Sequence, residues 1–167
     1  MSVTLPFVAL IDTSVFLCRL GERPHDTDSP ACVEFCDRMM KANRTICVAA
    51  PTITEVTRFK GAPLPRVAGI VVVAFDEPAA TLLGMKLPSR ALKDWRDVTK
   101  DRGLDHIKYD ALIIGCAMRV PNARFIGMDK GQLAMAKHVG LKAHHPREFL
   151  EEAPSRRAAE QGKLLPD

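Results

Sequence analysis

Short apolar runs alternate with longer amphipathic segments along this chain, and this alternation restricts the fold more than any other feature of the sequence. Val8–Ile11 is a continuous apolar run that ends in polar residues, as is typical of a strand buried on both faces of a parallel sheet. Runs of the same kind occupy residues 45–50, 69–75 and 123–128, and a weaker one occupies residues 140–144. The sequence therefore predicts four to five short strands that lie far apart in the chain.

The segments between these runs carry apolar residues at helical spacing. Predicted helices cover residues 14–21, 28–43, 52–59, 77–86, 89–103, 109–119 and 129–140. Strands separated by helices require right-handed crossovers, which place helices on both faces of the sheet. The predicted fold class is therefore α/β: a three-layer α/β/α sandwich around a central, mostly parallel sheet of four to five strands.

Length and composition fit one domain over residues 1–150, followed by a loosely ordered tail over residues 151–167, where the apolar pattern ends. No apolar run approaches the roughly 18 residues of a membrane span, and the start lacks a signal-peptide pattern, so a soluble cytoplasmic protein is expected. The net charge of +4 suits a polyanionic partner. The five cysteines are odd in number and contain no C-x-x-C pair, so they are predicted to be buried apolar residues.

Four acidic residues are predicted to meet at one edge of the sheet. Asp12 directly follows the first predicted strand and Asp129 the fourth, whereas Glu55 and Asp110 are expected in the first turns of their helices. In an open parallel sheet, ligands bind outside the carboxyl ends of the strands, where helix N-termini also gather. Carboxylates from four distant segments are thus expected to converge there.

Such a group of acids has a chemical use. Carboxylates held close together raise each other's pKa values, and a divalent cation relieves their repulsion. Mg²⁺ and Mn²⁺ prefer oxygen ligands, retain several waters and can activate one of them for attack on a phosphodiester. The residues therefore predict a Mg²⁺ or Mn²⁺ site. Each acid taken singly also fits a helix cap, Asp12 least well because it follows a buried strand.

Four segments, in this order, resemble the motifs of PIN-domain ribonucleases, in particular the VapC-like toxins of type II toxin–antitoxin systems. The segments are LIDTSVFL, PTITEVTRF, YDALIIGCAMR and RFIGMDKGQL, and VGLKAHHPREFL resembles the closing strand and helix of that family. The resemblance covers residues 7–150 and implies a PIN-like fold and a metal-dependent endoribonuclease, a hydrolase of RNA. It implies that Asp12, Glu55, Asp110 and Asp129 are the catalytic and metal-binding residues.

The resemblance implies further roles and partners. Ser14 would support Asp12 or a metal-bound water, although it also fits a cap on the first helix. The partners would be RNA and a small antitoxin that blocks the acidic pocket, and a homodimer stays open. Many relatives carry Thr just before the fourth acid and Asp or Asn after it, whereas here Gly127 and Met128 precede Asp129 and KGQ follows. This difference leaves open whether one or two metal ions bind.

Basic residues near the predicted site are candidate contacts for RNA phosphates. They are Arg19, Arg58, Lys60 and Lys108. A basic rim would also balance the charge of an acidic site, so these residues do not by themselves indicate RNA. His144 and His145 are adjacent and would point to opposite faces of a strand, which disfavours a shared metal.

Two other classes of function stay open. One is a PIN-like domain with weak or no catalysis that binds RNA or protein, although a pure binder has no need for four mutually repelling acids. The other is a phosphotransfer enzyme of the haloacid-dehalogenase type, which also begins with an apolar strand into Asp. That chemistry needs a second Asp two residues later, where this chain has Ser14.

Overall fold

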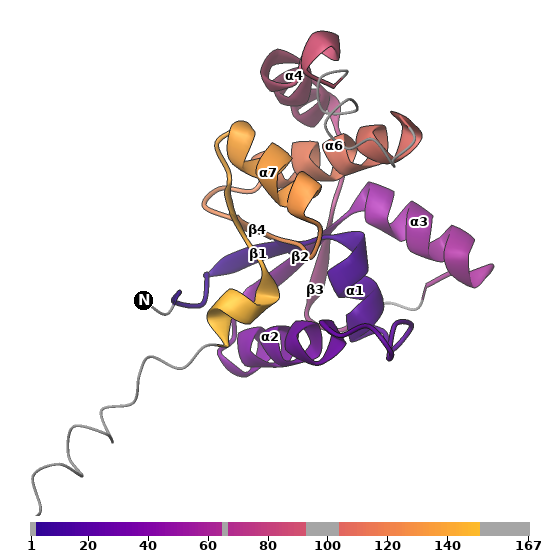
Figure 1. Cartoon of the computed structure of the whole chain (residues 1–167), viewed down its shortest axis with the longest axis vertical. Helices are drawn as coiled ribbons and strands as arrows, with labels where there is room; N and C mark the ends of the chain where they lie inside the picture. Colours follow the sequence, from indigo (N-terminus) through magenta and orange to yellow (C-terminus); the bar gives the residue numbers. More distant parts are fainter. Residues whose placement is uncertain (1–2, 65–66, 93–103, 151–167) are drawn as a thin grey trace, which may run out of the picture.

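The computed structural model describes residues 3–64, 67–92 and 104–150, which form a five-stranded sheet with helices on both faces (Figure 1). The strands are β1 (Val8–Ile11), β2 (Thr45–Ala49), β3 (Ile70–Val73), β4 (Arg124–Ile126) and β5 (Lys142–His144). The described helices are α1 (Thr13–Arg19), α2 (Ser29–Lys41), α3 (Ala50–Lys60), α4 (Glu77–Lys86), α6 (Leu104–Met118), α7 (Lys130–His138) and the 3₁₀ helix η1 (Pro146–Phe149). The strand order is β3-β2-β1-β4-β5 and every pair is parallel. The predicted three-layer α/β/α sandwich is confirmed.

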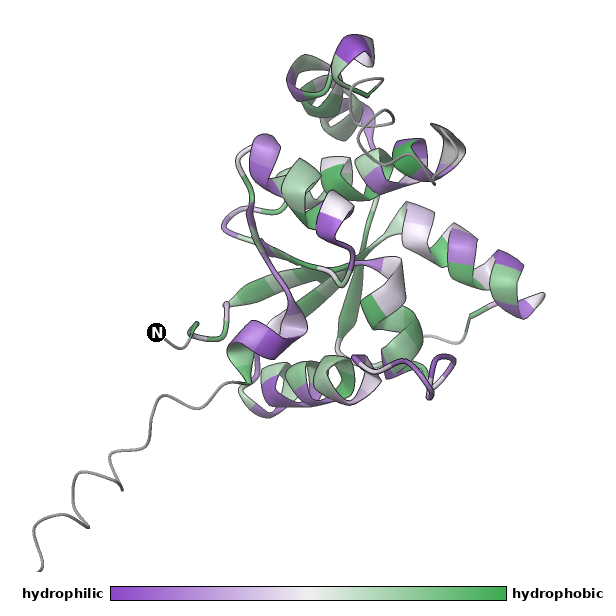
Figure 2. Cartoon of the chain, in the orientation of Figure 1, coloured by the Kyte–Doolittle hydropathy of each residue, from purple (hydrophilic) through white to green (hydrophobic). Residues whose placement is uncertain are grey.

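Each face of the sheet is buried by its own group of helices. Leu10 of β1 and Phe125 of β4 belong to the core that includes α6 and α7, whereas Ile11 and Ile126 belong to the core with α1, α2 and η1. Successive residues of a strand point to opposite faces, so burial on both faces makes the central strands β1 and β2 almost continuously apolar (Figure 2). The two cores thus explain the apolar runs of β1 and β2. The prediction that the run containing β3 is also buried on both faces is wrong, because β3 lies at the edge of the sheet and Val71 and Val72 are largely exposed.

The sheet reverses its order at β1. The chain passes from β1 outward through β2 to β3, and β4 and β5 then lie on the other side of β1. In the register, Ile11 at the end of β1 lies opposite Val48 of β2 and Ile126 of β4. The crevice outside the carboxyl ends of β1 and β4 is thus the topological switch point, the place where open α/β sheets bind ligands.

The helices that carry Glu55 and Asp110 both begin earlier than the sequence predicted. α3 starts at Ala50 rather than at residue 52, because Pro51 is compatible with a first helical turn. α6 starts at Leu104 rather than at residue 109, and Ile107, in the added part, is buried. Glu55 therefore lies in the second turn of α3, and Asp110 lies about two turns into α6. The prediction that both acids occupy first turns is wrong.

Some predictions fall beyond the described residues. Most of the helix expected over residues 89–103 lies outside them, and so does the tail expected over residues 151–167. The domain boundary at residue 150 consequently stays a prediction. Throughout the described ranges, no helix combines the length and the apolar character that crossing a bilayer requires.

Candidate active site

Asp12 follows β1 directly and has only 2% of its surface exposed. Its main-chain N–H donates to the carbonyl oxygen of Ile126 (2.9 Å), which ties the end of β1 to β4. Its Oδ1 accepts from the main-chain N–H of Val15 (2.7 Å), so Asp12 is also the N-cap of α1. The Ser14 hydroxyl lies 2.9 Å from Oδ1 and 2.7 Å from Oδ2. Ser14 thus holds the Asp12 carboxylate, and a part for Ser14 in catalysis stays a prediction.

Gly127, the first residue after β4, leaves just enough room for that carboxylate. A Cβ at this position would lie 3.0 Å from Asp12 Oδ2 and 3.2 Å from Phe125 Cε1, which is tighter than nine in ten observed Cβ contacts. The next residue, Met128, directs its main-chain N–H toward Asp12 Oδ2 at 3.4 Å. The glycine at this position therefore has a packing reason: a side chain here would press on Asp12.

The environment of Asp12 favours its protonated form. Burial raises the pKa of this carboxyl from 3.8 to about 6. Hydrogen bonds from Val15, Ser14 and Met128 lower this pKa, whereas the negative charge of Asp129 raises it. Asp129 is therefore near enough to repel Asp12, and a cation between them would favour the ionised form.

Glu55 reaches the same region from α3 through a side-chain contact. The Thr13 hydroxyl, at the start of α1 and next to Asp12, donates to Glu55 Oε2 and lies 3.3 Å from the hydroxyl of the buried Thr52. The two hydroxyls of the Asp-Thr-Ser segment thus serve different acids: Ser14 contacts Asp12, and Thr13 contacts Glu55.

Asp110 is connected to Asp129 through Gln132. Asp129 is the N-cap of α7, where its Oδ1 accepts from the main-chain N–H of Gln132 (2.7 Å). The side-chain amide of Gln132 in turn donates to Asp110 Oδ1 (3.1 Å). Only 4% of Gln132 is exposed, so this amide is a buried polar bridge between α7 and α6.

The four predicted acids are therefore joined by contacts rather than gathered into one cluster. Asp12 lies beside Thr13, which binds Glu55, and Asp129 lies beside Gln132, which binds Asp110. In the part of the chain that the structure describes, no group of three or more His, Cys, Asp or Glu side chains is arranged to hold a metal ion. The chemistry of the four acids nevertheless fits Mg²⁺ or Mn²⁺, because these ions prefer oxygen ligands and each acid offers carboxylate oxygens.

The predicted RNA-contacting residues differ in their surroundings. Arg19 forms an ion pair with Asp37 (3.3 Å), and Lys60 pairs with Glu22. Lys108 is exposed on α6. Arg58, three residues after Glu55 on α3, donates from Nη1 to the hydroxyl of Tyr109 on α6 (2.9 Å).

The sulfur and imidazole groups offer no second site within the described residues. All five cysteines are buried, as predicted, and burial raises the pKa of Cys32, Cys36 and Cys116, which keeps them as unreactive thiols. His144 contacts Glu148 through Nδ1 (2.8 Å), whereas His145 accepts from the main-chain N–H of Arg147 (3.2 Å). The two imidazoles thus have different partners.

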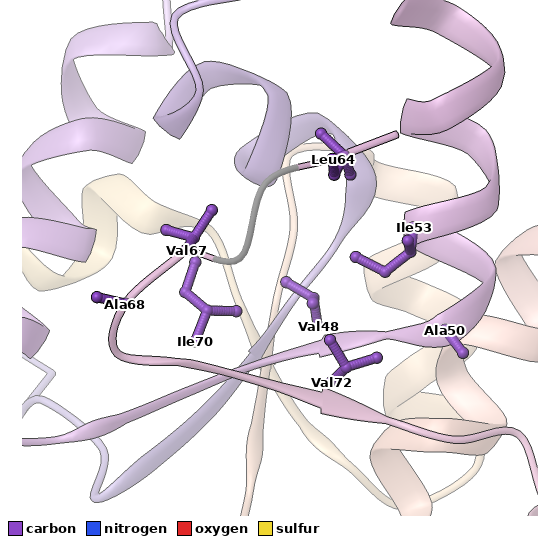
Figure 3. A pocket seen from close by; sticks show the side chains of 8 residues that line it. All are labelled: Val48, Ala50, Ile53, Leu64, Val67, Ala68, Ile70 and Val72. Carbon is purple, nitrogen blue, oxygen red and sulfur yellow. The ribbon is translucent and has the colours of Figure 1, made fainter. Parts of the chain in front are cut away.

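An apolar cavity of about 650 Å³ lies beside the edge strand β3, apart from the acids. Its lining residues are Val48, Ala50, Ile53, Leu64, Val67, Ala68, Ile70 and Val72, and Figure 3 shows them around a common space. On the same strand, Val71 and Val72 are 52% and 56% exposed. None of the described residues that line the cavity is an acid or a base, so they give no support to chemistry there.

No family model and no curated protein matches this chain, whereas its structure is similar to solved structures that include two complexes. One is VapBC2 from Rickettsia felis bound to a DNA fragment from its promoter: TM-score 0.55, 12% identity, over 83% of this chain and 98% of that chain. The other is FitAB bound to an IR36 DNA fragment: TM-score 0.52, 15% identity, over 83% of this chain and 94% of that chain. The chain has a PIN-like fold. At 12% and 15% identity, these two similarities establish the fold alone.

The sequence did not reveal how three residues organise the acids: Thr13, Gly127 and Gln132. Gln132 carried a usable signal, because Asp-x-x-Gln at a helix start resembles a capping box. In the structure its main chain completes the cap while its side chain turns to Asp110. The roles of Thr13 and Gly127 depend on contacts between distant segments, which the sequence does not display.

Proposed function

We propose that this chain is a metal-dependent endoribonuclease and the toxin of a toxin–antitoxin pair. The observation that carries the proposal is the buried Asp12 at the switch point of a PIN-like sheet, with Asp129 close enough to raise its pKa. Two further acids, Glu55 and Asp110, are linked to this pair through Thr13 and through the amide of Gln132. A buried carboxylate with a second one nearby, and two further acids linked to this pair, supports cation-assisted phosphodiester hydrolysis.

Asp12, Glu55, Asp110 and Asp129 would hold the cation. When bound, Mg²⁺ or Mn²⁺ supplies charge neutralisation and an activated water for in-line attack on phosphorus. The protein's own part is positioning: Ser14 and the main-chain N–H of Val15 orient the Asp12 carboxylate. These contacts fix Asp12 before the substrate arrives, which reduces the cost of organising the site during the reaction.

The toxin role is proposed from the resemblance of the motifs together with the fold. Both similar structures are complexes of paired proteins with DNA, VapBC2 and FitAB. A small antitoxin would cover the acidic edge and block RNA, and an antitoxin encoded next to this chain should co-purify with it. A homodimer of this chain stays a further prediction.

One observation favours a second candidate, a PIN-like domain that binds RNA or protein without cleaving it. Across the described ranges, no three acidic, histidine or cysteine side chains are placed to hold a metal. In that case the contacts of Thr13 and Gln132 would be purely structural. The two candidates predict opposite results for cleavage in the presence of metal.

The test is cleavage of total RNA by the full chain with Mg²⁺, with Mn²⁺ and with EDTA. We expect cleavage with either ion, none with EDTA, and loss of activity in Asp12→Asn. The matched control is Asp37→Asn, the same chemical change on α2, where Asp37 pairs with Arg19 away from the acids. Binding of RNA without cleavage under any metal would overturn the nuclease proposal in favour of the binding domain.

A further inference from the structure

Arg58 connects the two helices that carry Glu55 and Asp110. It is three residues after Glu55 on α3, and its partner Tyr109 immediately precedes Asp110 on α6. The Arg58–Tyr109 hydrogen bond (2.9 Å) therefore joins the two helices beside the acids that each of them carries. The guanidinium carbon of Arg58 is 5.8 Å from the centre of the Tyr109 ring, within the range of a cation–π contact.

Among the described residues, no carboxylate pairs with Arg58. Its hydrogen-bonding partner is a neutral phenol. Glu55 is one turn away on the same helix, yet it accepts from Thr13 instead. Arg19 and Lys60, by contrast, are each paired with a carboxylate.

The hydrogen bond to Tyr109 also leaves the guanidinium well suited to a phosphate. A guanidinium has five N–H donors in a fixed plane, which match two oxygens of a phosphate group. One of these donors contacts Tyr109, and the exposed side chain can direct others toward solvent. A phenol that orients the plane reduces the entropy lost when a phosphate binds.

We infer that Arg58, oriented by Tyr109, binds a backbone phosphate of single-stranded RNA next to the acidic site. The inference rests on the proposed function for its substrate. In this arrangement Arg58 is a substrate-binding residue and Tyr109 is a positioning residue. The phosphate contact holds the strand at the rim between α3 and α6, so that a neighbouring phosphodiester faces the acids.

The test measures binding of a fluorescent, mixed-sequence, single-stranded oligoribonucleotide as a function of salt. The full chain is used in an Asp12→Asn background, so that binding is read without turnover. We expect Arg58→Gln to weaken binding about tenfold at low salt. The slope of log affinity against log salt should also fall by about 0.7, the value for one single-strand phosphate contact.

Three further variants separate phosphate binding from a general effect of charge. Tyr109→Phe keeps the charge, so the salt slope should stay unchanged while affinity falls about threefold. Arg58→Lys should also keep the slope but lose part of the affinity, because an ammonium lacks the planar fork. Lys41→Gln removes the same charge at the exposed C-terminal end of α2, shortly before the start of β2. This variant should change neither the salt slope nor the affinity beyond experimental error.

Each outcome decides the inference. Equal slopes and affinities for Arg58→Gln, Lys41→Gln and the background overturn it, and so does an absence of RNA binding. Binding that depends on Arg58, in a wild-type chain that never cleaves RNA, overturns the nuclease proposal but supports this inference. Cleavage of RNA by the wild type, combined with RNA binding that does not depend on Arg58, supports the nuclease proposal and overturns this inference.

Discussion

The acids of the candidate site form two pairs that the fold holds in different ways. The strand-end pair, Asp12 and Asp129, lies in the connections that follow β1 and β4, and each acid caps the next helix by accepting from a main-chain N–H. The mid-helix pair, Glu55 and Asp110, projects from inside α3 and α6. Each mid-helix acid accepts from a side chain of another element, Thr13 or Gln132.

This difference separates what the backbone determines from what single side chains determine. The strand-end pair is positioned by sheet register and helix caps, which most substitutions leave intact. The mid-helix pair accepts hydrogen bonds from one hydroxyl and one amide that lie outside the sheet, so its geometry can be altered without disturbing the sheet. If the site binds a cation, the strand-end pair should be essential and the mid-helix pair adjustable.

The largest expected effect comes from replacing the acids themselves. We expect Asp129→Asn to reduce the rate of RNA cleavage on the order of a thousandfold, because a charged cation ligand at the switch point is lost. Glu55→Gln keeps an acceptor for Thr13 and should reduce the rate less, about tenfold to a hundredfold. Single-turnover rates with saturating Mn²⁺ measure both. Equal losses in the two variants would show that the pairs do not differ.

The next effect is a pH dependence of stability that singles out Asp12. Its pKa is raised to about 6 in the folded chain, so the folded state binds a proton more tightly than the unfolded state. The stabilisation from that proton is fully present below pH 4 and is lost as the pH rises through 6. Relative to wild type, Asp12→Asn should therefore gain about 3 kcal/mol of unfolding free energy between pH 4 and pH 8.

Urea unfolding in EDTA across this pH range measures that gain. Asp37→Asn is the control, because Asp37 is an exposed partner of Arg19 on α2. A difference between Asp12→Asn and wild type that stays constant with pH would show that Asp12 titrates normally.

A smaller effect is expected from filling the space that Gly127 leaves for Asp12. In Gly127→Ala, the added methyl group would lie 3.0 Å from Asp12 Oδ2, so the carboxylate or β4 must move. We expect a loss of about 1 to 3 kcal/mol in unfolding free energy, together with weaker cleavage. Gly84→Ala on α4, where nothing lies within 4 Å, should be neutral or stabilising. Equal unfolding free energies of the two variants would show that Gly127 is not needed to make room for Asp12.

The smallest effect should come from the side chains that hold the mid-helix pair. Thr13→Val removes the donor to Glu55 and should lower the cleavage rate about fivefold, the worth of one hydrogen bond. Gln132→Leu should act similarly through Asp110. Thr13→Ser retains a hydroxyl and should restore most of the rate. If Thr13→Ser is as impaired as Thr13→Val, the hydroxyl is not what positions Glu55.

The same distinction explains what the sequence could predict. The strand-end position of Asp12 follows from an apolar run that ends in an acid, so its burial at the sheet edge was predictable. The first-turn positions of Glu55 and Asp110 were wrong because helix starts depend on weak local signals. For α6 a signal existed: Leu104, Ile107 and Ala111 have helical spacing, and Ile107 is buried.

Other parts of the site depend on contacts that a single sequence does not show. The space for Asp12 beside Gly127 exists only because β1 and β4 are neighbours in the sheet. The orientation of Arg58 depends on Tyr109, which is 51 residues away in the chain. Tertiary packing, rather than local pattern, thus determines how the residues around the acids are arranged.

The central claim is that the acids at the switch point form a cation site. Titration of the full chain with Mn²⁺ at pH 8, followed by calorimetry, tests it without requiring RNA or turnover. We predict saturable binding by wild type and by Asp37→Asn, and loss of binding in Asp12→Asn and Asp129→Asn. Binding of Mn²⁺ by Asp12→Asn with wild-type affinity, or no binding by wild type, would contradict the account.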